Sequence, residues 1–216
     1  MLENQKRSKL FTFSLQAQDA FGKAMGLTIL WSIWALFFSN IDSIFIANVI
    51  LSALCLGLAL IAPLIDFNES HATNPLWTGH ARFHLVWQVN ALAASGILVL
   101  VLLWVIPSAM NLLISIIILY VWLLSFMFAL IFMPIYNGKL NDVNGVPPIK
   151  ISLFKKQIEI DRNVQAISAG LILSTYASLI IFFALLGYVA SANLIRFFIS
   201  SKKIETSFMV FAIESQ

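Results

Sequence analysis

The chain has 216 residues, of which 60% are hydrophobic and 11% charged, and its mean hydropathy is +0.91. Soluble domains carry about 25% charged residues, so the composition excludes a soluble domain and predicts an integral membrane protein. The apolar runs are too long and continuous for barrel strands, so we expect an all-α, polytopic transmembrane helical bundle. The net charge of +3 is then a topology signal, and nucleic acid is not expected as a partner.

In chain order, the first apolar block is about twice as long as one bilayer crossing needs, and a polar patch at residues 39–43 divides it. Pro63 is expected to end the second helix, because proline cannot continue a helix normally. We treat residues 1–216 as a single transmembrane domain with spans at about 23–39, 43–65, 80–106, 108–136 and 165–190. The first of these is short, and if it lies tilted or partly re-entrant the count falls to four.

Two polar segments, 66–79 and 137–162, separate the spans. The second begins with turn-forming residues and then mixes Lys with Ile, Leu and Phe, so we expect it to lie along the lipid headgroups. In a five-span chain the basic residues of the N-terminus and of 137–162 fall on one side of the membrane. This predicts an inner or plasma membrane protein with a cytoplasmic N-terminus and segment 66–79 on the same side. With four spans, segment 66–79 would face the opposite side.

All three histidines fall within "DFNESHATNPLWTGHARFH", residues 66–84, which we call the histidine window. His80 and His84 are four residues apart and so share one face of a helix, and Gln88 extends that face. Thr78 is placed to cap this helix. Because the bilayer penalises polar groups, we expect the face to point into the bundle.

Two imidazoles at this spacing commonly present two nitrogen ligands to one metal ion. The Asn74-Pro75 turn allows His71 to fold back as a third ligand, with Asp66 as a fourth ligand or a base. Three histidines and a carboxylate suit copper, iron or zinc, and haem is the less favoured cofactor. The residues expected to orient these ligands or to contact a substrate are Asn68, Glu69, Asn74, Arg82 and Gln88.

The histidine window resembles the signature of a family of small membrane proteins of bacteria and fungi, Asp-x-Asn-x-Thr-His-x-x-Asn-Pro-x-Trp-Pro-Pro-His-Ala-Arg/Lys-Phe-His. The matching residues are Asp66, Asn68, His71, Asn74, Pro75, Trp77, His80, Ala81, Arg82, Phe83 and His84. Ser70 stands in place of Thr, and Thr78-Gly79 in place of Pro-Pro. The likeness covers about nineteen residues and implies that the window is the site, without indicating a reaction.

The window supports two hypotheses of function. The first is a metal-dependent oxidoreductase at the bilayer edge that acts on a lipid-soluble or small substrate. The second is a non-enzymatic membrane subunit or binding protein, whose window docks a partner subunit, a lipid headgroup or haem. A weaker third is a metal-free isomerase that uses His and a carboxylate as acid and base. Membrane lipids and partner membrane subunits are the expected partners.

Polar residues within the spans are few. Asn48, Asn90, Asn111 and Asn193 are expected to form interhelical hydrogen bonds. Asp, Glu and Lys are missing from the middle of the predicted spans, so the sequence does not support a proton relay or an ion pump.

Overall fold

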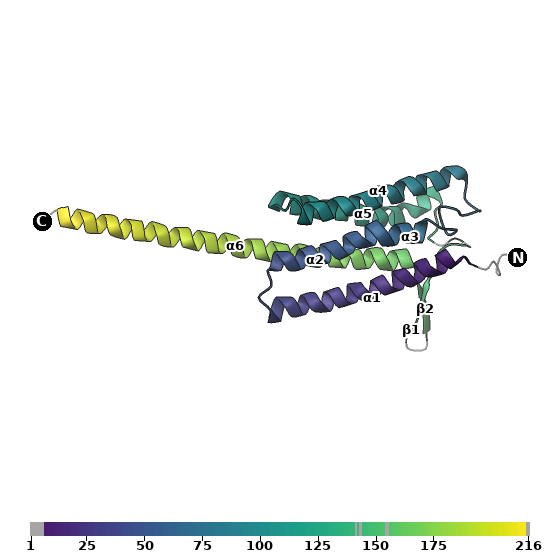
Figure 1. Ribbon diagram of the computed structural model, residues 1–216, viewed down its shortest axis with the longest axis horizontal. Helices are drawn as coiled ribbons and strands as arrows, with labels where there is room; N and C mark the ends of the chain where they lie inside the picture. Colours follow the sequence, from purple (N-terminus) through teal and green to yellow (C-terminus); the bar gives the residue numbers. More distant parts are fainter. Residues whose placement is uncertain (1–6, 141, 143, 154–155, 215–216) are drawn as a thin grey trace.

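The computed structural model places five long helices lengthwise in one bundle (Figure 1). It describes residues 7–140, 142, 144–153 and 156–214, but not the side chains of 151, 153, 156 and 192–214. Within this part of the chain, five helical segments are long and apolar enough to cross a membrane: Lys9–Phe38, Ser43–Asp66, Gly79–Trp104, Ala109–Tyr136 and Arg162–Ser191. The predicted all-α, multi-pass bundle with five spans is confirmed.

The first helix, α1 (Lys9–Phe38), begins well before the expected start at residue 23. The Ser8 hydroxyl caps it by accepting a hydrogen bond from the backbone N–H of Phe11, at 3.0 Å. Phe11 and Ser14 are buried in the first turns, so this mixed-polarity stretch has a packed face that the sequence did not reveal. With 30 residues the helix is about 45 Å long, and the short first span that motivated a four-span chain is not found.

The second span is continuous but changes its winding. It consists of α2 (Ser43–Leu56), a π-helical segment (Gly57–Ile61) and α3 (Ala62–Asp66). In the π-helical segment the backbone N–H of Ala62 bonds to the carbonyl of Gly57, five residues back. This wider turn accommodates Pro63, which lacks the N–H that a regular α-helix would use. The helix therefore ends at Asp66, close to the predicted boundary, rather than at the proline.

The third and fourth spans are joined by a short link and are antiparallel neighbours (Figure 1). They are α4 (Gly79–Trp104) and α5 (Ala109–Phe132), which continues as a 3₁₀ turn to Tyr136. Thr78 caps α4 as expected, because its hydroxyl accepts from the N–H of Ala81 at 3.2 Å. At Gly96 a Cβ atom would lie 2.7 Å from the carbonyl oxygen of Cys55, so the missing side chain lets α4 pack closely on the second span.

Segment 137–162 contains a β-hairpin, which the sequence analysis did not predict. Strands β1 (Ile149–Leu153) and β2 (Lys156–Ile160) pair antiparallel, with Lys150 opposite Glu159 and a 3.1 Å ion pair between their side chains. Apolar and polar residues alternate with a period of two, which is the pattern of a strand. The placement of this segment along the lipid headgroups stays a prediction.

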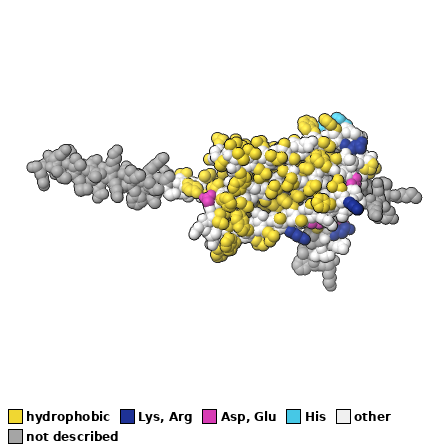
Figure 2. All heavy atoms as spheres, viewed as in Figure 1, with side chains coloured by type: hydrophobic (Ala, Val, Ile, Leu, Met, Phe, Trp, Pro, Cys, Tyr) yellow, Lys and Arg dark blue, Asp and Glu magenta, His cyan; other side chains and the backbone are white. Residues whose placement is uncertain are grey.

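The last helix, α6 (Arg162–Glu214), includes the predicted span 165–190 and projects beyond the bundle (Figure 1). The side chain of Asn193, expected to form an interhelical hydrogen bond, lies outside the described part of this helix. The outer surface of the bundle is covered by hydrophobic side chains (Figure 2), as the acyl chains of a bilayer require. The buried core lies between α2, α4, α5 and α6 and includes Ile50, Cys55, Val99, Leu119 and Leu173.

The start of α1, the histidine window and the hairpin all lie at one end of the bundle (Figure 1). Lys and Arg side chains gather at the same end (Figure 2). The basic N-terminal region and segment 137–162, which were expected to share one side of the membrane, thus lie at the same end of the bundle, and the histidine window lies there too.

Candidate functional site

The histidine window runs from the end of α3, through an irregular loop at residues 67–78, into the first turns of α4. Backbone hydrogen bonds fold the loop on itself, from the N–H of Ala72 to the carbonyl of Asp66 and from that of Thr73 to the carbonyl of Asn68. A second pair of turns follows, in which Asn74 bonds back to His71 and Trp77 to Asn74. The loop is thus a compact structure above the end of the second span.

Asn68 and Ser70 form the buried centre of this loop, with 3% and 1% of their surface exposed. The Asn68 amide donates to the carbonyl of Ile65 at 2.9 Å and accepts from the backbone N–H and the hydroxyl of Ser70 at 2.9 and 2.8 Å. These bonds satisfy groups at the C-terminus of α3 that have no partner within the helix. Asn68 therefore ends the helix and shapes the loop.

His71 lies beside Asp66 and Ser70. Its Nδ1 atom is 2.8 Å from the Ser70 hydroxyl and 3.4 Å from a carboxylate oxygen of Asp66. The Ser70 hydroxyl has a single proton and lies within hydrogen-bond distance of the Asn68 side-chain oxygen, the Ile65 carbonyl and Nδ1 of His71, so the direction of its bond to the ring depends on the tautomer of His71. The expected proximity of Asp66 to a histidine is therefore found, within the loop itself.

These three residues resemble a Ser-His-Asp constellation in composition but not in geometry. In a catalytic triad the hydroxyl and the carboxylate contact opposite ring nitrogens, whereas here both lie against Nδ1 of His71. Ser70 is also 1% exposed and thus closed to a substrate. Burial lowers the pKa of His71, a shift that the negative charge of Asp142 partly opposes. The arrangement is that of a neutral, structural histidine.

Glu69 ties the loop to the start of α1. Its two carboxylate oxygens accept from the backbone N–H of Ser8 at 2.7 Å and from the Ser8 hydroxyl at 2.6 Å. Partial burial raises the pKa of Glu69, but the hydrogen bonds from Ser8, helped by the charge of Arg7, outweigh it and leave the pKa below its ordinary value. Glu69 therefore acts as an ionised clasp between two segments far apart in the sequence.

Asn74 is fully buried and pairs with Asn144, seventy positions away. Each side-chain amide donates to the other, at 3.1 and 2.8 Å, and Asn74 also donates to the carbonyl of Ser70 and accepts from the N–H of Leu76. Next to this pair, the indole N–H of Trp77 donates to Asp142 at 2.8 Å. The loop is thereby fastened to the segment that precedes the hairpin.

His80 and His84 lie on α4 with their Nε2 atoms 3.0 Å apart and their ring planes at 85°. The two histidines share one face of the helix, as their spacing predicted, and Gln88 lies one turn further along α4. The predicted direction is wrong, because His80, His84 and Gln88 are all exposed on the outside of the bundle. The physical reason is that α4 buries the opposite side, which includes Val89 and Gly96, against its neighbours.

The predicted convergence of three imidazoles and a carboxylate is not found: among the described residues, no group of three or more His, Cys, Asp or Glu side chains is placed to hold one metal ion. The window instead holds two separate pairs, Asp66 with His71 and His80 with His84. His71 is fixed in the loop by burial and by Ser70, whereas the other two rings project from α4.

Arg82 and Gln88 were expected near the ligands. Arg82 is partly buried, and its side chain forms no hydrogen bond or ion pair with the part of the chain that the structure describes. Exposed Phe83 and Trp87 stand beside His84, with ring centroids 5.8 and 5.9 Å from its own. Tryptophan is enriched at membrane–water interfaces, so Trp87 supports an interfacial position for the start of α4.

Comparison with family models, with curated proteins and with solved structures gave no match to this chain. The resemblance of the histidine window to a family of membrane proteins therefore stays a prediction based on the motif. Sequence reasoning missed Ser8, Asp142 and Asn144 as partners of the window. The turn sequence around Asn144-Gly145 was a signal for a loop, but nothing in it indicated contact with residues 69–77.

Proposed function

We propose that this multi-pass membrane protein binds a divalent transition metal ion through His80 and His84, at the edge of the membrane. The observation that carries the proposal is the 3.0 Å separation of the two Nε2 atoms on an exposed face of α4. The proposal keeps the metal expected from the sequence but assigns it to two of the four predicted ligands. His71 and Asp66 stabilise the loop instead.

The separation of the two nitrogens suits adjacent positions around one ion. With metal–nitrogen distances of about 2.0–2.1 Å, nitrogens 3.0 Å apart subtend an angle of roughly 90–97° at the metal. Copper(II) and nickel(II) favour tetragonal sites with angles near this value. A tetrahedral zinc site would need the nitrogens to open to about 3.3 Å, which a small rotation of either exposed ring provides.

Two protein ligands leave the remaining positions of the ion open. An exposed pair at the membrane interface favours a binding protein or a subunit that shares the ion with a partner subunit or a lipid phosphate. This is the non-enzymatic hypothesis of the sequence analysis in a more specific form. The oxidoreductase hypothesis stays a prediction: it requires turnover of a lipid-soluble substrate by the metal-loaded protein.

The end of the bundle that holds the site is proposed to face the cytoplasm. Lys and Arg side chains gather at this end (Figure 2), where α1 begins at Lys9 and β1 contains Lys150, and cytoplasmic segments carry an excess of Lys and Arg. Thr73 is exposed in the loop at 67–78, so a Thr73→Cys variant tests the orientation. We expect a membrane-impermeant maleimide to label it only after the cytoplasmic face is opened.

The metal proposal is tested by calorimetric titration of copper(II), nickel(II) and zinc(II) into the purified protein without a polyhistidine tag. We expect His80→Ala and His84→Ala each to weaken binding by at least roughly tenfold, since each removes one of two ligands. His71→Ala is the matched control and should bind metal within about threefold of the wild type. Equal affinity in all four proteins, or loss of binding only in His71→Ala, would contradict the proposal.

A further inference from the structure

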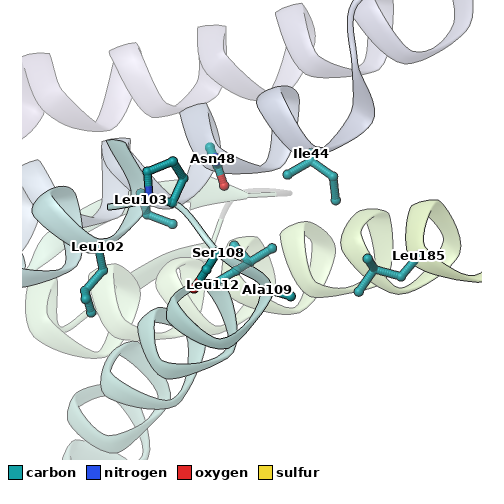
Figure 3. Close-up of a pocket in the computed structure, with 9 residues that line it drawn as sticks. Ile44, Asn48, Leu102, Leu103, Ser108, Ala109, Leu112 and Leu185 are labelled. Atoms are coloured by element: carbon teal, nitrogen blue, oxygen red, sulfur yellow. The ribbon is translucent and has the colours of Figure 1, made fainter. Parts of the chain in front are cut away.

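At the end of the bundle opposite to the histidine window, the helices border a half-open cavity of about 280 Å³ (Figure 3). It lies between the first turns of α2, the α4–α5 connection and α6, and its lining includes Asn48, Leu102, Ser108, Ala109, Leu112 and Leu185. All but two of these side chains are apolar. The cavity shares no residue with the metal pair, so a ligand in it would be independent of the proposed metal ion.

Asn48 is the unusual member of this lining. It was expected to form an interhelical hydrogen bond, but its side-chain oxygen is buried and has no hydrogen-bond partner among the described residues. Figure 3 shows the oxygen directed into the space between α2 and the α4–α5 connection. A buried acceptor without a hydrogen-bond partner costs free energy. A hydrogen-bond donor bound in the adjacent cavity would remove that cost.

Two neighbouring hydroxyl groups do not supply that donor. The hydroxyl of Ser108 accepts from the N–H of Asn111 at 3.0 Å as the cap of α5 and forms no hydrogen bond with the Asn48 oxygen. The hydroxyl of Ser52, one turn along α2, donates to the backbone carbonyl of Asn48 rather than to its side chain. The terminal torsion of an asparagine is soft, so a small rotation presents its oxygen to a molecule in the cavity.

We propose that this cavity binds a small apolar molecule that carries one hydroxyl group, and that the hydroxyl donates to Asn48. The size fits, because an apolar cavity of about 150 Å³ holds benzene and this one is nearly twice as large. The position also fits. Asn48 lies between one and two turns from the start of α2 at Ser43, so the hydroxyl would lie near the interface and the apolar body among the leucines.

The proposal is tested with a matched pair of probes, 4-(trifluoromethyl)phenol and 4-(trifluoromethyl)anisole. They differ in that the anisole cannot donate a hydrogen bond. Binding is measured by fluorine NMR on the full chain in lipid nanodiscs, with empty nanodiscs to correct for partition into the bilayer. We expect the wild type to bind the phenol roughly 2- to 12-fold more tightly than the anisole, the range that one neutral hydrogen bond provides.

Asn48→Leu keeps the number and branching of the side-chain heavy atoms and removes the acceptor, so it should abolish the preference while binding of the anisole is retained. Asn90→Leu, which changes an exposed asparagine of α4, is the control and should keep the preference. Leu112→Trp fills the cavity and should abolish binding of both probes, which verifies the location by a second route. If both probes bind the wild type equally, or if the preference survives in Asn48→Leu, the cavity is only a site for lipid acyl chains and the proposal is wrong. The proposal is also wrong if neither probe binds the protein beyond its partition into empty nanodiscs.

Discussion

Replacing Asn74 by alanine should open the histidine loop while leaving the bundle intact. Asn74 is fully buried, and its side chain takes part in four hydrogen bonds: two with Asn144, one to the carbonyl of Ser70 and one from the N–H of Leu76. All four connect parts of the loop or fasten it to the segment before the hairpin. None involves the transmembrane core, so the effect should stay local.

The magnitude follows from these bonds. A hydrogen bond of this kind contributes a net ~1 kcal/mol, and the loss of several leaves buried partners unsatisfied, so we expect the free energy of opening the loop to fall by about 2–4 kcal/mol. At 1.4 kcal/mol per factor of ten, this corresponds to roughly 30- to 900-fold faster amide exchange, up to the limit of an unfolded peptide. The affected amides are those that bond within the loop, including Ala72, Thr73 and Trp77.

Hydrogen–deuterium exchange with mass spectrometry measures this directly, on peptides that cover residues 67–78. Asn144→Ala removes only the two bonds of the amide pair, so it should show about half of the free-energy effect. In the double variant the two effects should be less than additive, because they share those bonds. If exchange in Asn74→Ala stays within about threefold of the wild type, or rises equally in α4 and α6, the reasoning is refuted.

Two further predictions concern packing and pH. Gly96→Ala places a Cβ atom 2.7 Å from the Cys55 carbonyl and should cost about 1–3 kcal/mol in unfolding by SDS titration; Gly187→Ala, where nothing lies within 4 Å, should not destabilise. Acid should also break the contact between Glu69 and Ser8. Partial burial raises the pKa of Glu69, but the hydrogen bonds from Ser8 outweigh it and hold that pKa below its ordinary value of 4.5. This contribution to stability is complete above about pH 4.5 and is lost as the pH falls further. Amide exchange around Ser8 and Glu69 that is no faster at pH 3.5 than at pH 6, after correction for the intrinsic rates, would contradict this.

The class of protein and the positions of the apolar helices followed from the sequence, whereas the choice between four and five spans needed the full length of α1. The apolar runs are as long as a bilayer crossing requires, and each backbone group must be satisfied within its own helix in lipid, so length and hydropathy suffice. The cap at Thr78 and the shared face of His80 and His84 also followed from the sequence, because both depend on contacts within a few residues.

Predictions from local sequence failed at two places, the end of the second helix and the hairpin. Pro63 predicted a helix end, but the π-helical turn before it absorbs the missing hydrogen bond and the helix continues to Asp66. The hairpin at 149–160 was hidden because its apolar residues are also compatible with a membrane surface. The period-two pattern was present in the sequence, and a count of that alternation would have found it.

Only the tertiary structure decided which way the polar groups face and what they meet. Helical spacing places His80 and His84 together, but whether that face turns inward depends on how α4 packs, and it packs through Gly96 on the second span. The partners of Glu69 and Asn74 are 61 and 70 positions away in the sequence, and no local pattern specifies such a distance. The unpartnered oxygen of Asn48 arises in the same way, because satisfaction of a buried amide depends on the side chains that the other helices bring to it.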